Sequence, residues 1–173
     1  MLFLTTVTCQ AIFAQTPQGL NKYPIPNSKN STYIPALPFI LQYSAEKSLM
    51  ILPRFKSDKA TDSLAGIIGF DLFAKGMGKC FQHDTLAMTF ENGKKLIIRT
   101  INPEICDQPN SGWSVLSDED LTTLFSGKLQ QILYTNGKTQ ETIIQDITAS
   151  ADKEYFLVLK KVYDTMAMKG KSN

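Results

Sequence analysis

The stretch that decides the fold is TLAMTF-ENG-KKLIIRTI, residues 85–101, in which two apolar-rich runs flank an Asn-Gly pair. Asn-Gly between two such runs is the strongest short-range signal for a β-hairpin, because both residues tolerate the positive φ that tight turns need. The stretch therefore predicts two antiparallel strands joined at Asn92-Gly93.

The register of this hairpin follows from its apolar pattern. A loop of residues 91–93 places Met88 opposite Leu96 and gathers the apolar side chains on one face. A two-residue loop would instead place Phe90 opposite Lys95. A slip of one residue moves a whole strand to the other face, so the pattern predicts the three-residue loop.

Further strands are expected on both sides of this hairpin. KLQQILYT-NG-KTQETII, residues 128–144, predicts a second hairpin around Asn136-Gly137. KSLMILPRF, residues 47–55, predicts a strand, and Pro53 favours an edge position for it because proline has no amide hydrogen. Residues 63–73 fit either a strand or a buried helix, and their glycines and β-branched residues favour a strand.

Two helices are expected near the C-terminus. Ser117 and Asp120 have the spacing of a capping box that opens a short helix closed by Gly127. Ser150 or Asp152 caps a final helix that runs to about residue 168. Its apolar residues form one stripe: Tyr155, Phe156, Leu159, Val162, Tyr163 and Met166. The expected fold class is α+β: an antiparallel sheet with two Asn-Gly hairpins, a short helix, and a C-terminal amphipathic helix packed on one face.

The chain is expected to divide into four segments. Residues 1–14 lack charge and are mostly apolar, which indicates a signal peptide whose charged start is missing or truncated, although a short buried strand or helix also fits. Residues 15–45 hold five prolines and predict a tether without regular structure before about residue 43. Residues 46–168 form a single domain, and residues 169–173 a tail. We expect an exported protein, periplasmic or extracellular, with no membrane span in the mature chain.

Charge argues against one class of partner. The net charge of the 173-residue chain is +2, and its cationic residues include two arginines, Arg54 and Arg99, with the lysines scattered. Nucleic-acid binding needs a concentrated basic patch, so we expect no nucleic-acid partner.

The stretch KCFQHD, residues 79–84, holds the chain's one histidine and raises the question of a catalytic or metal site. If residues 80–90 form one strand, Cys80 and His83 point to opposite faces and cannot form a thiolate–imidazole pair. A zinc site would have to combine Cys80, His83 and Cys106 with Asp84 or another acid, without the close cysteine pairs that such sites use. We therefore expect neither catalytic residues nor a metal or other cofactor.

A disulfide is the simpler expectation for the cysteines. After signal removal two remain, Cys80 and Cys106, in an oxidising compartment. The hairpin register places Cys106 diagonally across from Cys80 on the same face, where twist or a bulge would allow the bond. Two buried free thiols are the alternative. Trp113, in NSGWS, is either an exposed contact residue or a plug in the core.

The run KCFQHDTLAMTFENGKKLIIRT and the ending KEYFLVLKKVYD resemble small uncharacterised exported proteins of Bacteroidetes-type bacteria. The resemblance covers about residues 70–165. It implies an exported α+β domain and carries no known catalytic residues.

Three functions remain open on the sequence alone. The first is a non-catalytic exported domain that binds a protein or cell-surface component. The second is a small hydrolase or metal-binding enzyme using His83 with Asp84 or a cysteine. The third is a carrier of an apolar small ligand, held between the sheet and the C-terminal helix under Tyr155 and Tyr163.

Overall fold

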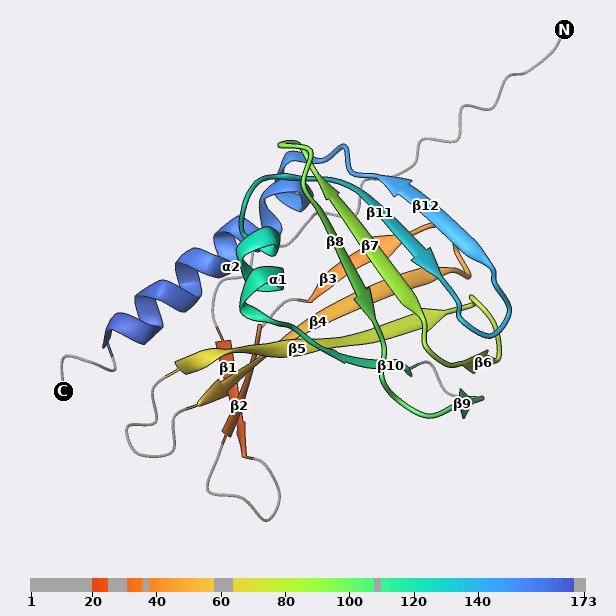
Figure 1. Ribbon diagram of the computed structural model, residues 1–173, viewed down its shortest axis with the longest axis horizontal. Coiled ribbons are helices and arrows are strands. Elements are labelled where there is room, and N and C mark those ends of the chain that lie inside the picture. Colours follow the sequence, from red (N-terminus) through yellow and green to blue (C-terminus); the bar gives the residue numbers. More distant parts are fainter. Residues whose placement is uncertain (1–19, 25–30, 36–37, 58–63, 108–109, 170–173) are drawn as a thin grey trace, which may run out of the picture.

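The computed structural model describes residues 20–24, 31–35, 38–57, 64–107 and 110–169. In these ranges the chain has two main antiparallel sheets, a separate pair of short strands and two helices (Figure 1). The expected α+β class is confirmed. The strands form two main sheets, however, where the sequence predicted one.

The larger sheet has six strands in the order β1-β2-β4-β5-β10, with β3 also paired to β4. They are β1 (Leu20–Pro24), β2 (Ser31–Pro35), β3 (Phe39–Gln42), β4 (Ser48–Ser57), β5 (Leu64–Lys75) and β10 (Asn110–Val115). β5 covers most of the segment that fitted either a strand or a helix, and it is a strand, as the sequence favoured.

The predicted lack of regular structure in residues 15–45 is wrong in the parts that the structure describes. β1, β2 and β3 all lie there, and Phe39 and Leu41 of β3 are buried in the core. The prolines did not prevent this because Pro24 and Pro35 stand at the ends of their strands. The domain therefore begins no later than residue 39, and not at residue 46 as expected.

Pro53 also occupies a position that the sequence did not predict. Its strand β4 is interior, paired with β5 along one side and with β3 and β2 on the other. β3 pairs with residues 48–51, and β2 with residues 55–56. Pro53 pairs with Phe70 of β5 on one side and falls in the gap between β3 and β2 on the other, where neither of these two strands needs its amide as a donor.

The smaller sheet has four strands in the order β12-β11-β7-β8. They are β7 (Thr85–Phe90), β8 (Lys95–Arg99), β11 (Leu129–Thr135) and β12 (Thr142–Asp146). The register of the first hairpin is confirmed: Met88 pairs with Leu96, and Gly93 has a φ of 80° in the loop. The second hairpin is confirmed too, but its loop spans residues 136–141.

Helix α1 (Asp118–Leu124) begins with the predicted capping box. The Ser117 hydroxyl accepts from the Asp120 amide, and the Asp120 carboxylate accepts from the Ser117 amide. The predicted closing residue is wrong, because the helix ends at Leu124 with Phe125 as its cap, before Gly127 is reached. Leu124, the last helical residue, is buried, and the Phe125 amide donates to the Leu121 carbonyl to close the last turn.

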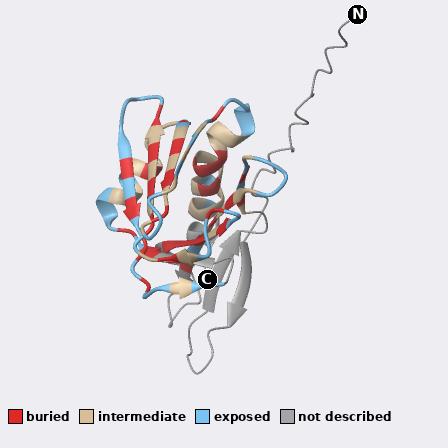
Figure 2. Ribbon diagram, turned by 90° about the vertical axis from the view of Figure 1, so that its right-hand side faces the viewer, coloured by how far each residue is buried: buried red, intermediate tan, exposed pale blue. Residues whose placement is uncertain are grey.

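Helix α2 (Ser150–Lys169) packs against β11 and β5, and so against both main sheets. Its predicted stripe is buried where it meets the core, at Tyr155, Phe156 and Leu159. The Phe39 ring lies 5.1 Å from that of Tyr155 and 5.6 Å from that of Phe156, centroid to centroid. Figure 2 shows buried residues on α2 and on strands of both sheets, and these form one hydrophobic core.

Some expectations fall outside the described residues. These are the signal peptide at residues 1–14, and the tail beyond Lys169, where α2 ends. Neither described helix combines the length and the apolarity needed to cross a membrane.

Candidate functional site

Cys80 and Cys106 form a disulfide, with an S–S distance of 2.11 Å. They lie on two short paired strands, β6 (Cys80–Phe81) and β9 (Ile105–Cys106). The two residues are directly opposite, with Cα atoms 4.1 Å apart, and not diagonal as the sequence predicted. The reason is that residues 80–90 are not one strand: the chain bends at residues 82–84 between β6 and β7.

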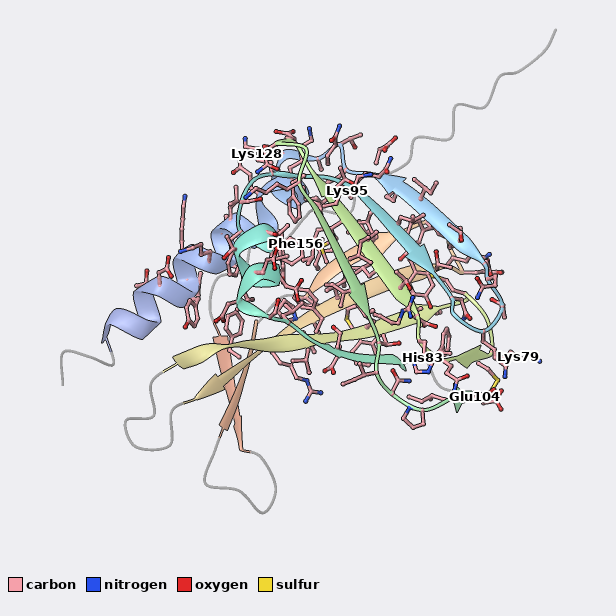
Figure 3. All side chains as sticks on the ribbon, in the orientation of Figure 1. Lys79, His83, Lys95, Glu104, Lys128 and Phe156 are labelled. Atoms are coloured by element: carbon pink, nitrogen blue, oxygen red, sulfur yellow. A yellow bond between two sulfur atoms is a disulfide. The ribbon has the colours of Figure 1, made fainter. Side chains whose placement is uncertain are left out.

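Glu104 lies beside this disulfide, at the end of the molecule where Figure 3 labels it. One carboxylate oxygen and the two sulfur atoms lie within 4.8 Å of one another, the spacing of a metal site. The sulfurs are bonded to each other, however, so neither is a thiolate that could bind a metal ion. The Glu104 carboxylate pairs with the Lys138 ammonium at 3.1 Å.

His83 stands at the bend with a φ of 55° and an exposed side chain. Its Nδ1 lies 3.4 Å from the Thr100 carbonyl oxygen. The alternative in which His83 activates a thiol requires that thiol within hydrogen-bond reach of the imidazole, and the partner at Nδ1 is a peptide carbonyl.

Asp84, the next residue, is fully buried. Its carboxylate accepts a hydrogen bond from the Tyr134 hydroxyl at 2.6 Å and another from the Gly137 amide at 2.9 Å. Its own carbonyl accepts from the Thr100 amide at 2.9 Å. Asp84 lies just before β7, and its hydrogen bonds connect it to Tyr134 of β11 and to Thr100, just after β8. The Asp84 side chain is therefore buried, whereas that of His83 is exposed.

Asn136 is a second buried polar residue at this end of the sheet, and it precedes Gly137, whose amide donates to Asp84. We call Asp84 and Asn136 together the polar cluster. Its side-chain amide donates to the Met77 and Cys80 carbonyls at 3.0 and 3.1 Å. Its side-chain oxygen accepts from the Lys138 and Thr139 amides at 2.8 and 2.9 Å. Asn136 is 0% exposed, and its bonds to Met77 and Cys80 connect the second hairpin to the segment that carries the disulfide.

Trp113 lies on β10 and pairs with Asp71 of β5, and its side chain is outside the described residues. Asp71 is buried and forms an ion pair with Arg54. Burial raises the pKa of the Asp71 carboxyl, and the Arg54 guanidinium opposes that shift.

An open groove of about 440 Å³ lies between α1 and α2. Its lining includes Leu121 and Phe125 from α1 and its cap, and Tyr163 from α2. Tyr163 also stacks on Phe55, with ring centroids 5.5 Å apart. Tyr155, the other residue of the expected ligand position, is buried, and its ring packs against those of Phe39 and Phe156.

The outer face of the four-stranded sheet has an apolar row that crosses all four strands. Direct cross-strand pairing puts its members side by side: Ile97, Ala87, Leu133 and Ile144. The isoleucines on the edge strands β8 and β12 are 66% and 62% exposed. Large aliphatic side chains this exposed, in a continuous row, are typical of a contact surface.

Polar residues flank this row on both sides. One flanking row is Lys95, Thr89, Gln131 and Asp146. The other is Arg99, Thr85, Thr135 and Thr142. These three rows make up what we call the outer face.

The outer face is not among the sites expected from the sequence, although the sequence contains a signal for it. In a strand, adjacent residues point to opposite faces, so two adjacent apolar residues cannot both enter the core. Ile97-Ile98 and Ile143-Ile144 are such pairs. In each pair the residue on the outer face is the exposed one, Ile97 or Ile144.

Comparison of the chain with protein-family models, with curated proteins and with solved structures finds no match.

Proposed function

We propose that the chain is an exported, non-catalytic domain that binds another protein through its outer face. The observation that carries this proposal is the apolar row from Ile97 to Ile144 between two polar rows. Apolar residues at the centre with polar residues around them match the anatomy of protein–protein interfaces. A sheet face fits a protein surface better than a small molecule, because small molecules are held in concave pockets.

Two features support export. The Cys80–Cys106 disulfide is compatible with an oxidising compartment, since cytosolic thiols are kept reduced. The uncharged apolar start of the sequence, residues 1–14, has the composition of a signal peptide.

The catalytic alternative has less support from the geometry. It requires His83 to act with Asp84 or with a cysteine. The His83 imidazole is next to a peptide carbonyl, the Asp84 carboxylate is held by Tyr134 and Gly137, and the sulfurs are bonded together.

The proposal is tested by affinity isolation from the envelope fraction of the producing cells. Ile97 and Ile144 are replaced together by threonine, which keeps the β-branched shape that strands favour. We expect the wild type to retain at least one protein. The I97T/I144T variant should retain about ten-fold less of that protein, or less still. Thr122→Ala, an exposed change on α1, is the control and should retain that protein fully. Equal retention by all three forms would refute the proposal.

A small apolar ligand in the groove is the second candidate, since about 440 Å³ lies within the size range of ligand sites. The test is the fluorescence of 1-anilinonaphthalene-8-sulfonate, an amphiphilic probe of apolar pockets. Enhancement that Leu121→Lys removes and I97T/I144T leaves unchanged would support this candidate. Equal enhancement in all three forms would count against it.

A further inference from the structure

The outer face is complementary to itself. Consider two copies stacked face to face about a two-fold axis that lies between them, parallel to the strands and midway between β7 and β11. This rotation places β8 of one copy over β12 of the other and β7 over β11. Each of the three rows then lies over the same row of the other copy. Ile97 of one copy then meets Ile144 of the other, and the small Ala87 meets the larger Leu133. Both contacts occur twice, as a two-fold interface requires.

The charges select this axis over the other in-plane choice. With the axis parallel to the strands, Lys95 of one copy meets Asp146 of the other, again twice. Arg99 meets Thr142, whose hydroxyl can accept from the guanidinium. An axis along the rows would instead bring Lys95 against Arg99, and like charges in contact oppose association.

The side chains involved are available for these contacts. Lys95 and Asp146 are both exposed. One Asp146 oxygen accepts from the Gln131 side chain at 2.8 Å, and a carboxylate has further acceptor positions for a second donor. Packed sheets commonly cross at about 30°, and the long lysine side chain spans the small offset that such a crossing introduces.

The size of the face sets the expected affinity. Four strands spaced about 4.8 Å apart and three rows spaced about 6.8 Å apart give roughly 400 Å² per copy. This is about half of the ~800 Å² per partner in a stable interface, so the dimer should be weak. A dissociation constant in the micromolar to millimolar range is expected.

We propose that the protein bound by the outer face is a second copy of this chain, packed about a two-fold axis parallel to the strands. This inference rests on the proposed function, because it uses the same surface. It adds the identity of the partner, the symmetry and the charge pairs.

The test is sedimentation equilibrium of the full chain up to millimolar concentration, with charge-exchange variants. K95D and D146K should each weaken the dimer about ten-fold or more, because each places like charges opposite one another. The variant K95D/D146K restores opposite charges and should dimerise like the wild type. A mixture of K95D with D146K should form a mixed dimer about as readily as the wild type dimerises, although each variant alone dimerises about ten-fold or more weakly.

Lys94→Asp and Glu119→Lys are matched controls, because they make the same charge changes at exposed positions away from the outer face. They should leave the dimer unchanged. A monomeric wild type, a K95D no weaker than K94D, or a mixture that does not associate would each overturn the inference.

The results also separate this inference from the proposed function. If the wild type is monomeric but I97T/I144T loses a retained protein, the partner is a different protein, and only the self-association fails. Suppose instead that the dimer forms as expected, and that the wild type and I97T/I144T retain the same amount of every other protein. Self-association is then supported, and binding of a different protein is refuted.

Discussion

Two regions of the four-stranded sheet reverse the usual distribution of polar and apolar groups. At one end, Asp84 and Asn136 are polar side chains with no exposed surface. On the outer face, Ile97 and Ile144 are apolar side chains with more than three-fifths of their surface exposed. The first region supports the fold, because the polar atoms of both side chains are hydrogen-bonded to donors and acceptors within the chain. The second has no such matching within the described residues.

The contrast separates residues that support the fold from residues that can contact a partner. A buried polar group is costly unless it is hydrogen-bonded, so the Asp84 and Asn136 contacts are accounted for by the fold itself. Exposed aliphatic groups in a row add little to the stability of a monomer. Mutations should therefore separate the two regions: those in the polar cluster change stability, and those on the outer face change association.

The largest effect is expected at Asp84. Asp84→Ala removes the carboxylate and leaves the Tyr134 hydroxyl and the Gly137 amide without that acceptor in a buried place. We expect a loss of about 3–5 kcal/mol in the free energy of unfolding. Urea unfolding followed by circular dichroism measures it. Glu104→Ala, which removes an exposed carboxylate, is the control and should lose about 1 kcal/mol or less. Equal losses would show that the buried hydrogen bonds of Asp84 stabilise the fold no more than the exposed ion pair of Glu104 does.

The disulfide should come next. It closes a loop of 26 residues, so replacing both Cys80 and Cys106 by serine should lower the free energy of unfolding by about 2–4 kcal/mol. The measurement is the difference in urea midpoint between the oxidised wild type and the variant. Addition of dithiothreitol should move the wild type towards the variant and leave the variant unchanged. A wild type insensitive to reductant would contradict the structural role assigned to this bond.

The two Asn-Gly turns give a matched pair of smaller effects. A Cβ on Gly137 would lie 1.9 Å from the Gln82 carbonyl oxygen, whereas a Cβ on Gly93 meets nothing within 4 Å. Gly137→Ala should therefore cost about 2–3 kcal/mol, by forcing the backbone apart. Gly93→Ala should cost about 1 kcal/mol, from its positive φ alone. Thermal unfolding of both variants checks the order, and a reversed order would mean that the second hairpin is not held against the bend at residues 82–84.

The smallest effect on stability is expected on the outer face. I97T/I144T removes exposed apolar groups that make little contact in the monomer, so its free energy of unfolding should stay within about 0.5 kcal/mol of the wild type. The same urea experiment tests this. A loss above 2 kcal/mol would show that these residues support the fold, and the distinction between the two regions would fail.

The sequence predicted the parts of the fold whose information is local. The register of the hairpin in residues 85–101 is correct because its turn and its alternating pattern are contained in those seventeen residues. The capping box at Ser117 and the buried stripe of α2 are correct for the same reason.

What the sequence could not predict depends on segments that meet only in the folded chain. Asn136-Gly137 looks like Asn92-Gly93, but its asparagine bonds to Met77 and Cys80, far away in sequence. Phe39 enters the core from a proline-rich segment because β4 provides a partner strand. The bend at His83, which brings the cysteines directly opposite each other, has no local signal of comparable strength.

The candidate site shows the same limit. Adjacent isoleucines in two strands already implied that one of each pair faces away from the core. That these residues fall in one row required the order of the four strands, which joins β8 and β12 through β7 and β11.

We propose that a protein covers the outer face when the chain functions in the cell. The most direct measurement is photo-crosslinking in the producing cells, with a benzophenone amino acid at position 97 and, as control, at position 119 on α1. We expect a crosslinked product from position 97 and none from position 119, with a mass of two chains if the partner is a second copy. No product from position 97, or equal products from both positions, would show that the outer face is not the surface that binds a protein.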